Sequence, residues 1–422
     1  MITRASNVLV VEGNMVPTDP EAGSETVPAR IEIDTASGLI QAVTTPRGAG
    51  DLVLGDEYII FPAFIDCHVH AREDASGAEN YKENFRTAGE AAVRGGVAAF
   101  VDMPNNPRPP ADNDTYRQKR DLAAESSVDV LLYACLGPDT RPLSFPVPYK
   151  AYMGPSVGHI FFEDEESLRE ALAHYHGHFV AFHAELPEIL RRHRKALTHA
   201  ERRPPEAEVE AIDLALRVSE NYQIEPHICH LSTAEGLELI RDARDRGLKV
   251  SCEVTPHHLY YDQDNAGVFA RPEYLQCNPP IRSRLDRIAL LEGLRSGDID
   301  YLATDHAPHT IDEKESGASG VTHLDTYGSF VFWLLQEGFS FQQIRRVCAE
   351  RPGRFLSRFL PLRYGKIAAG YAGSLTILKR TPVTIRRADL KTRAGWSVFE
   401  GQTFGGRVSH TIVRGQLHTL ED

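Results

Sequence analysis

The chain of 422 residues has few cysteines, no excess of positive charge and no long apolar run. Its six cysteines are scattered, without a C-x-x-C pair or disulfide-like spacing, which favours a reducing cytoplasmic compartment. The formal net charge of −13 argues against nonspecific binding to nucleic acid. No apolar stretch is long enough to span a membrane, and the first residues lack a signal-peptide pattern. We therefore expect a cytoplasmic protein that binds neither nucleic acid nor membrane.

The length of the chain and its pattern of predicted strands and helices indicate one large domain and one smaller domain. From Pro62 onward, strand candidates alternate with amphipathic helices, which predicts a parallel sheet covered by helices. About eight such units fill residues 62–366, the size of a (β/α)8 barrel. We therefore predict an α/β fold with a TIM-like barrel over residues 62–366.

The two ends of the chain show predicted strands and turns without the alternating helices of the middle. Residues 1–61 resemble short strands separated by turns, and strand-like segments return from Gly365 onward, beginning with Gly365–Gly370. We expect residues 1–61 and 367–422 to pair into one small composite β domain, a β-sandwich, beside the barrel.

A metal-ligand pattern follows the first strand of the predicted barrel. The apolar stretch Tyr58–Ile65 predicts a buried strand, which ends in Asp66-Cys67-His68-Val69-His70. Side chains alternate along a strand, so His68 and His70 point the same way and can bind one metal ion. A histidine pair alone also fits an ordinary surface, and the metal interpretation depends on residues further along. A helix is expected next, over Asn80–Gly95.

Three more candidate ligands come at the ends of predicted strands. His183 and His230 each end an apolar segment, and Asp305 follows Tyr301–Thr304. Singly, either histidine fits a buried core position, and Asp305 fits a turn or a helix cap. Active sites of such barrels are built at the carboxyl ends of the strands, so together these residues favour a metal site. Asp305 could also transfer a proton.

Lys150 lies within an apolar strand candidate, where burying its charge is costly. Its ammonium group could reach the surface. Alternatively, carbamylation by CO2 would convert the amine into an anionic group with two oxygens, able to bridge two cations. The sequence leaves both alternatives open.

The chain resembles the amidohydrolase superfamily, and within it the dihydroorotases of the cyclic-amidohydrolase group. The resemblance covers nearly the whole chain. It is carried by six motifs: Asp66-Cys67-His68-Val69-His70-Ala71-Arg72-Glu73, Asp102-Met103-Pro104-Asn105-Asn106-Pro107, His227-Ile228-Cys229-His230-Leu231-Ser232-Thr233, Cys252-Glu253-Val254-Thr255-Pro256-His257-His258, Asn278-Pro279-Pro280-Ile281-Arg282 and Ala303-Thr304-Asp305-His306-Ala307-Pro308-His309.

The resemblance implies two zinc ions in each subunit. One would be held by His68, His70 and Asp305, and the other by His183 and His230. Carboxylated Lys150 and a hydroxide would bridge them, with Asp305 as the general acid and base.

The resemblance also implies a substrate site and a reaction. Arg72, Asn105 and His309 would bind a substrate carboxylate, and Asn278 would contact a pyrimidine ring. A guanidinium group suits a carboxylate, although Arg72 could also form a surface ion pair. The implied reaction is the reversible cyclisation of N-carbamoyl-L-aspartate to L-dihydroorotate in pyrimidine biosynthesis.

The substrate rim departs from the family pattern at three places. Asp74-Ala75-Ser76-Gly77 replaces a usual Pro-Gly after Glu73, Asn106 replaces a usual Thr, and Ala71 replaces a commoner bulky apolar residue. These departures affect the expected fine specificity more than the metal site.

Two other functions compete with this interpretation. A hydantoinase, dihydropyrimidinase or allantoinase would share the metal residues but would need no cation for a carboxylate. A non-catalytic subunit that scaffolds aspartate transcarbamoylase would lack metal ligands. From the resemblance we also expect a homodimer, with an association with aspartate transcarbamoylase as a further expectation. The Gly-, Ser- and charge-rich segment 310–326 could be a mobile lid or an ordinary solvated loop.

Overall fold

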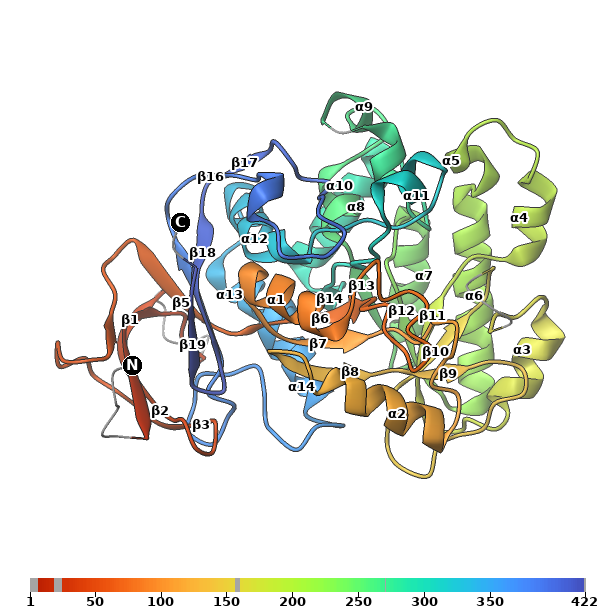
Figure 1. The fold of residues 1–422 in the computed structure, drawn as a ribbon. Helices are drawn as coiled ribbons and strands as arrows, with labels where there is room; N and C mark the ends of the chain where they lie inside the picture. The colour runs from red at the N-terminus through yellow and green to blue at the C-terminus, as the bar shows by residue number, and fades with distance from the viewer. Residues whose placement is uncertain (1–6, 19–24, 156–159, 270, 421–422) are drawn as a thin grey trace.

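The computed structural model describes residues 7–18, 25–155, 160–269 and 271–420 as a mixed α/β fold (Figure 1). An eight-stranded sheet lies at one end of the molecule, and the parallel strands with their helices form the rest. Both chain ends lie on the side of the eight-stranded sheet. Among the described residues, we find no helix with the length and apolar character needed to cross a bilayer.

The eight-stranded sheet combines strands from both ends of the chain, in the order β19-β18-β15-β5-β1-β2-β3 with β4 beside β1. Its strands are β1 (Val8–Met15), β2 (Val27–Asp34), β3 (Leu39–Thr44), β4 (Leu52–Val53), β5 (Tyr58–Pro62), β15 (Leu375–Lys379), β18 (Arg407–Val413) and β19 (Gln416–Thr419). The alternating burial of β2 fits a strand with one face packed on a core, whereas β5, β15 and β18 are buried along almost their whole length. The antiparallel pair β5–β15 joins the two ends, as the composite β domain requires. The exact division into two domains stays a prediction.

The parallel strands are arranged in chain order. One sheet contains β6 (Phe64–Val69), β7 (Val97–Asp102) and β8 (Asp129–Leu132). The other contains β9 (Ala134–Leu136), β10 (Tyr149–Tyr152), β11 (Phe179–His183), β12 (Glu225–Ile228), β13 (Ser251–Val254) and β14 (Tyr301–Leu302). Only Tyr133 separates β8 from β9, and a parallel bridge between Val69 and His306 links the segment after β14 to β6.

Helices follow most of these strands. They are α1 (Phe85–Gly95), α2 (Asn113–Ala123), α3 (Glu165–Leu172), α4 (Pro187–His193), α5 (His199–Arg202), α6 (Pro205–Tyr222), α7 (Ala234–Asp245), α8 (Pro256–Tyr260), α9 (Ala266–Phe269), α10 (Arg284–Ser296), α11 (Ile311–Glu315), α12 (Tyr327–Gln336), α13 (Phe341–Arg345) and α14 (Arg351–Leu356). A two-stranded ribbon, β16 (Val383–Thr384) with β17 (Thr403–Phe404), precedes β18.

Three predicted elements differ from the structure. The prediction of a single strand over Tyr58–Ile65 is wrong. The strand is interrupted at Ala63, whose N–H donates to the Ser374 carbonyl, and the two pieces, β5 and β6, belong to different sheets. The helix expected over Asn80–Gly95 begins only at Phe85, because Asn84 and Thr87 form a capping box. Residues 365–370 form no strand.

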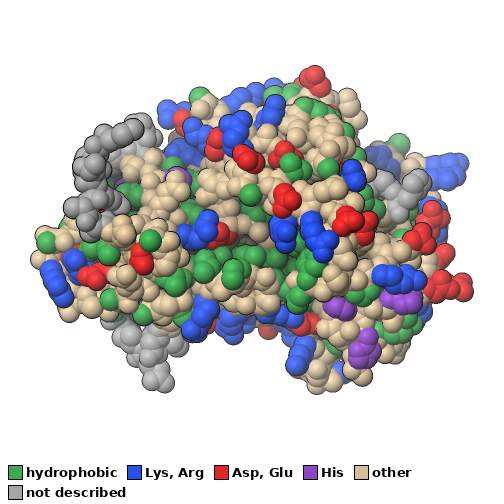
Figure 2. Space-filling model, turned by 60° about the horizontal axis from the view of Figure 1, so that its bottom comes forward, with side chains coloured by type: hydrophobic (Ala, Val, Ile, Leu, Met, Phe, Trp, Pro, Cys, Tyr) green, Lys and Arg blue, Asp and Glu red, His purple; other side chains and the backbone are tan. Residues whose placement is uncertain are grey.

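Charged side chains of both signs are interspersed over the face seen in Figure 2.

Candidate metal and substrate site

The predicted metal ligands meet at the carboxyl ends of the parallel strands. His68 lies in β6 and His70 directly after it, and His183 ends β11. His230 and Asp305 follow β12 and β14 in left-handed backbone conformations, with φ of 35° and 49°. Such conformations are uncommon for residues other than glycine, although Asp and His adopt them more readily than most, and they recur at functional sites where the surrounding structure holds them in place.

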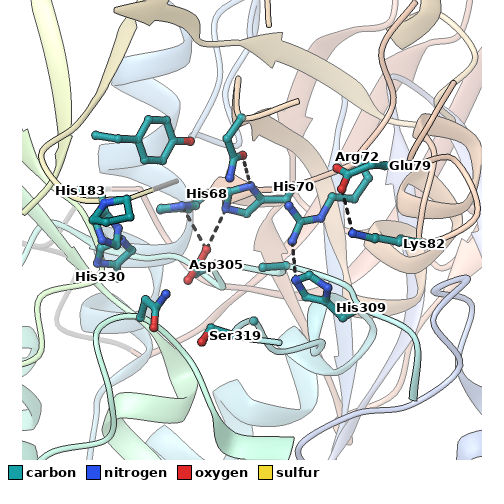
Figure 3. A pocket seen from close by; sticks show the side chains of 16 residues that line it. His68, His70, Arg72, Glu79, Lys82, His183, His230, Asp305, His309 and Ser319 are labelled. Atoms are coloured by element: carbon teal, nitrogen blue, oxygen red, sulfur yellow. Dashed lines mark hydrogen bonds and ion pairs between the residues drawn. The ribbon is translucent and has the colours of Figure 1, made fainter. Parts of the chain in front are cut away.

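The first cluster contains His68, His70 and Asp305, which point toward one another in Figure 3. The Oδ1 atom of Asp305 lies 3.2 Å from Nε2 of His68 and 3.0 Å from Nε2 of His70. Burial lowers the pKa of His70 to about 3, so its imidazole is neutral and can coordinate a cation. Burial opposes the charge of Asp305, but the neighbouring His68 keeps the pKa of that carboxyl well below its usual range.

The second cluster is His183 with His230, which lie side by side in the same cavity. The Nδ1 atom of His183 lies 2.9 Å from Nε2 of His230. Burial lowers the pKa of both imidazoles. The Nδ1 atom of His230 is buried and has no hydrogen-bond partner among the described residues. Ligand atoms of His68, His230 and Asp305 all lie within 4.8 Å of one another, which connects the two clusters.

The outward-facing ring nitrogens of three of these histidines are held by other side chains. Nδ1 of His70 donates to Oδ1 of Asn105 at 2.6 Å, and Nε2 of His183 donates to Oε2 of Glu185 at 2.9 Å. Nδ1 of His68 contacts Oε1 of Glu253. Histidines that bind metals are oriented in this way, with the second nitrogen on a carboxylate or carbonyl. Burial opposes the charge of His68, but Glu253 and Asp305 raise its pKa well above the usual range, so this ring would release a proton when it binds a cation. The donor set fits a divalent metal: four imidazoles and one carboxylate converge, and three of the rings are already oriented.

Lys150 is fully buried on β10, behind the wall of the cavity. Its Nζ atom donates to Sγ of Cys229 at 2.8 Å and lies 5.2 Å from the centre of the Tyr152 ring. The side chain does not reach the surface, so the first alternative for this lysine is wrong. The carbamylation of Lys150 and its bridging role remain predictions.

The predicted substrate residues lie beside the metal residues in the same cavity of about 400 Å³. Arg72, two residues beyond His70, has φ of 60°, and its Nη2 donates to Nε2 of His309 at 3.4 Å (Figure 3). Burial and the adjacent Arg72 lower the pKa of His309 to about 3. Asn105 and Asn278 also line the cavity, and Oδ1 of Asn278 is buried without a partner among the described residues.

Several residues of the site were not predicted. Glu253 contacts Nδ1 of His68, and Glu185 accepts from Nε2 of His183. Glu79 and Lys82 form an ion pair at 2.8 Å on the cavity rim. Glu253 falls within a motif of the resemblance, and Glu185 lies two residues after His183, so local sequence offers a signal for these two. The rim pair has no such signal, because Lys82 falls in the segment expected to be helical, Asn80–Gly95, and Glu79 directly precedes it.

The segment 310–326 is packed against the cavity wall. It contains α11, and Nζ of the buried Lys314 donates to the carbonyls of Gln276, Ala318 and Gly320 at 2.7–2.8 Å. Glu313 bonds to Tyr81 at 2.6 Å and forms an ion pair with Lys82 at 3.2 Å. The solvated-loop alternative does not fit these contacts, and movement of the segment as a lid stays a prediction.

Comparison with known proteins identifies the family. The sequence profile of the amidohydrolase family matches residues 59–418. The chain is 33% identical to a dihydroorotase of Pyrococcus furiosus over 367 residues, covering 86% of this chain and 82% of that protein. It is 32% identical to a dihydroorotase of Thermococcus kodakarensis over 417 residues, covering 97% and 94%.

Solved structures show the same fold. An L-hydantoinase (dihydropyrimidinase) from Arthrobacter aurescens superposes with a TM-score of 0.86 at 24% identity, covering 97% of this chain and 95% of that one. A dihydropyrimidinase from Brevibacillus agri superposes with a TM-score of 0.83 at 22% identity, covering 97% and 94%. The chain belongs to the amidohydrolase family, as a relative of the archaeal dihydroorotases.

Proposed function

We propose that the protein is a dihydroorotase, which interconverts N-carbamoyl-L-aspartate and L-dihydroorotate with loss or gain of water. The observation that carries the proposal is the placement of Arg72, Asn105 and His309 in the same cavity as the histidine–aspartate cluster. A cyclic amide with a carboxylate can then contact both groups at once. The identity to archaeal dihydroorotases over most of the chain supports the same activity.

We propose zinc as the metal, two ions in each subunit, held by His68, His70, His183, His230, Asp305 and carboxylated Lys150. Histidine nitrogen and carboxylate oxygen are ordinary zinc ligands. When bound, such ions lower the pKa of water and polarise a carbonyl group.

The chain's own residues account for binding and proton transfer. Arg72 offers a forked donor to the substrate carboxylate, and the Nδ2 amide of Asn105 offers a further donor. The uncharged His309 lies beside the same carboxylate position and accepts a hydrogen bond from Arg72, which holds the guanidinium group in place. In the hydrolytic direction, water adds to the ring carbonyl carbon and the carbon–nitrogen bond breaks. Asp305, a carboxylate at neutral pH, takes the proton from the attacking water and delivers it to the leaving nitrogen. Ring closure runs through the same steps in reverse.

The finer architecture belongs to this proposal. The chain order of the parallel strands and the bridge from Val69 to His306 support a closed (β/α)8 barrel, with the composite β domain as a sandwich beside it. A homodimer, an association with aspartate transcarbamoylase and a cytoplasmic location remain expectations from the resemblance and composition.

The competing activities make different use of the cavity. A hydantoinase, dihydropyrimidinase or allantoinase would leave Arg72 and His309 without a substrate carboxylate. A scaffold protein would have no use for the complete set of ligand residues.

The decisive assay compares four substrates on the zinc-loaded protein: L-dihydroorotate, dihydrouracil, hydantoin and allantoin. We expect hydrolysis of L-dihydroorotate with a kcat/KM at least about a hundredfold above the other three. Preference for a substrate without a carboxylate would assign a sibling activity. No turnover of any substrate, with metal bound, would support the scaffold alternative.

A further inference from the structure

A buried lysine that is not among the predicted site residues lies behind the part of the cavity wall formed by Arg72 and Asn105. Lys119 on α2 is 2% exposed, and its Nζ donates to the carbonyl of Met103 at 2.9 Å and to Oδ1 of Asn106. Nζ also forms an ion pair with Oδ2 of the buried Asp102 at 2.6 Å. The ammonium group thus makes two hydrogen bonds, and the adjacent carboxylate of Asp102 balances its charge. These contacts fix Nζ at the carboxyl end of β7.

The acceptors of Lys119 are connected to the segments that carry Arg72 and Asn105. Oδ1 of Asp102 accepts the backbone N–H of Ala71 at 2.8 Å, and Ala71 lies between His70 and Arg72. Asn106 directly follows Asn105, whose Oδ1 accepts from His70. One ammonium group thus ties the turn that carries Asn105 to the loop that carries Arg72, although α2 contributes no residue to the cavity lining.

We propose that Lys119 and Asn106 are positioning residues that determine the preference for substrates with a carboxylate. They hold Asn105 and Arg72 at the mutual spacing that a carboxylate requires. Asn106 stands where the family usually has a threonine, and its contact with Lys119 gives that departure a role in this chain. The inference rests on the proposed dihydroorotase function and names residues through which its substrate specificity is set.

A merely structural role for these residues predicts a different pattern. Loss of packing would lower stability, and it would weaken all ligands to a similar degree. Loss of positioning would weaken ligands with the carboxylate and spare those without it. Two ligands separate these cases: N-carbamoyl-L-aspartate, and N-carbamoyl-β-alanine, which lacks the carboxylate that Arg72 would bind.

The test is calorimetric binding of both ligands to the zinc-loaded, full-length protein. Asn106→Leu keeps the side-chain volume and removes the acceptor. We expect it to weaken N-carbamoyl-L-aspartate about tenfold or more and N-carbamoyl-β-alanine by less than about twofold. Asn106→Asp retains an acceptor for Lys119 and should recover most of the affinity. Arg120→Met, an exposed change on the same helix, should leave both affinities unchanged.

A second variant guards against a fold defect caused by an unpaired buried charge. Lys119→Met combined with Asp102→Asn removes both charges together and keeps an oxygen acceptor for Ala71. We expect this double variant to show the same selective loss. Equal weakening of both ligands, or unchanged binding in the two variants, would overturn the inference. If the unmodified protein already fails to prefer N-carbamoyl-L-aspartate, the proposed function itself fails and the inference fails with it.

Discussion

Nε2 of His183 lies 2.9 Å from Oε2 of Glu185, while Nδ1 of the same ring lies 2.9 Å from Nε2 of His230. Burial alone would raise the pKa of Glu185, but Arg203 and His183 lower it to about 2. The carboxylate is therefore charged at neutral pH and orients the ring so that Nδ1 faces the second histidine.

Glu185→Gln should weaken metal binding, because the amide keeps the shape but loses the negative charge that supports His183. Changes of this kind typically cost about 10–100-fold in metal affinity. Equilibrium dialysis against zinc measures the effect. Glu188→Gln, an exposed change at the start of α4, is the matched control and should leave affinity unaltered. Identical zinc affinity in the two variants would show that Glu185 does not support the centre.

Lys314→Met should destabilise the protein and loosen the segment 310–320. The lysine is fully buried, and its removal leaves the carbonyls of Gln276, Ala318 and Gly320 without their donor. We expect the free energy of unfolding to fall by about 2–4 kcal/mol. Chemical denaturation measures this change. The exposed Lys391→Met should stay within about 0.5 kcal/mol of the parent, and a similarly small effect at Lys314 would refute the anchoring role.

Acid should destabilise the fold through two buried histidines outside the predicted ligand set. Burial lowers the pKa of His258 to about 4 and the pKa of His323 to about 3. The unfolded chain takes up these protons near pH 6.5, whereas the folded protein does not. The free energy of unfolding should therefore fall as pH falls from about 6.5 to 4, by up to about 1.4 kcal/mol per pH unit for each histidine.

Denaturation at several pH values, with a chelator present so that metal release contributes nothing, measures this slope. Replacing His258 and His323 by Gln should flatten the slope. His176→Gln, an exposed change, should leave it as steep as in the parent. An unchanged slope in the double variant would mean that other groups cause the acid sensitivity.

The sequence predicts much of the fold because local patterns govern it. The apolar segment that ends at His183 forms a strand, β11, and the alternation in His68-Val69-His70 predicts two rings on one side of the chain, both of which contact Asp305. The interruption of the strand at Ala63 could not be predicted, because the N–H of Ala63 donates to the carbonyl of Ser374, more than 300 positions away.

The residues that support the site were harder to predict than those that line it. Glu253 and Lys119 act on His68 and Asn106 from other strands and helices, and no spacing along the chain relates these partners. The start of α1 was a different case. Its capping box, Asn84 with Thr87, is visible in the sequence, and it takes precedence over the helical periodicity of residues 80–83.

The most direct test of the account is a comparison of Arg72→Ala with the unmodified protein, both zinc-loaded, on L-dihydroorotate and on dihydrouracil. The account predicts that kcat/KM for L-dihydroorotate falls at least about a hundredfold, because the substrate carboxylate loses its cation, while any turnover of dihydrouracil is unaffected. Undiminished hydrolysis of L-dihydroorotate by the variant would contradict the central claim.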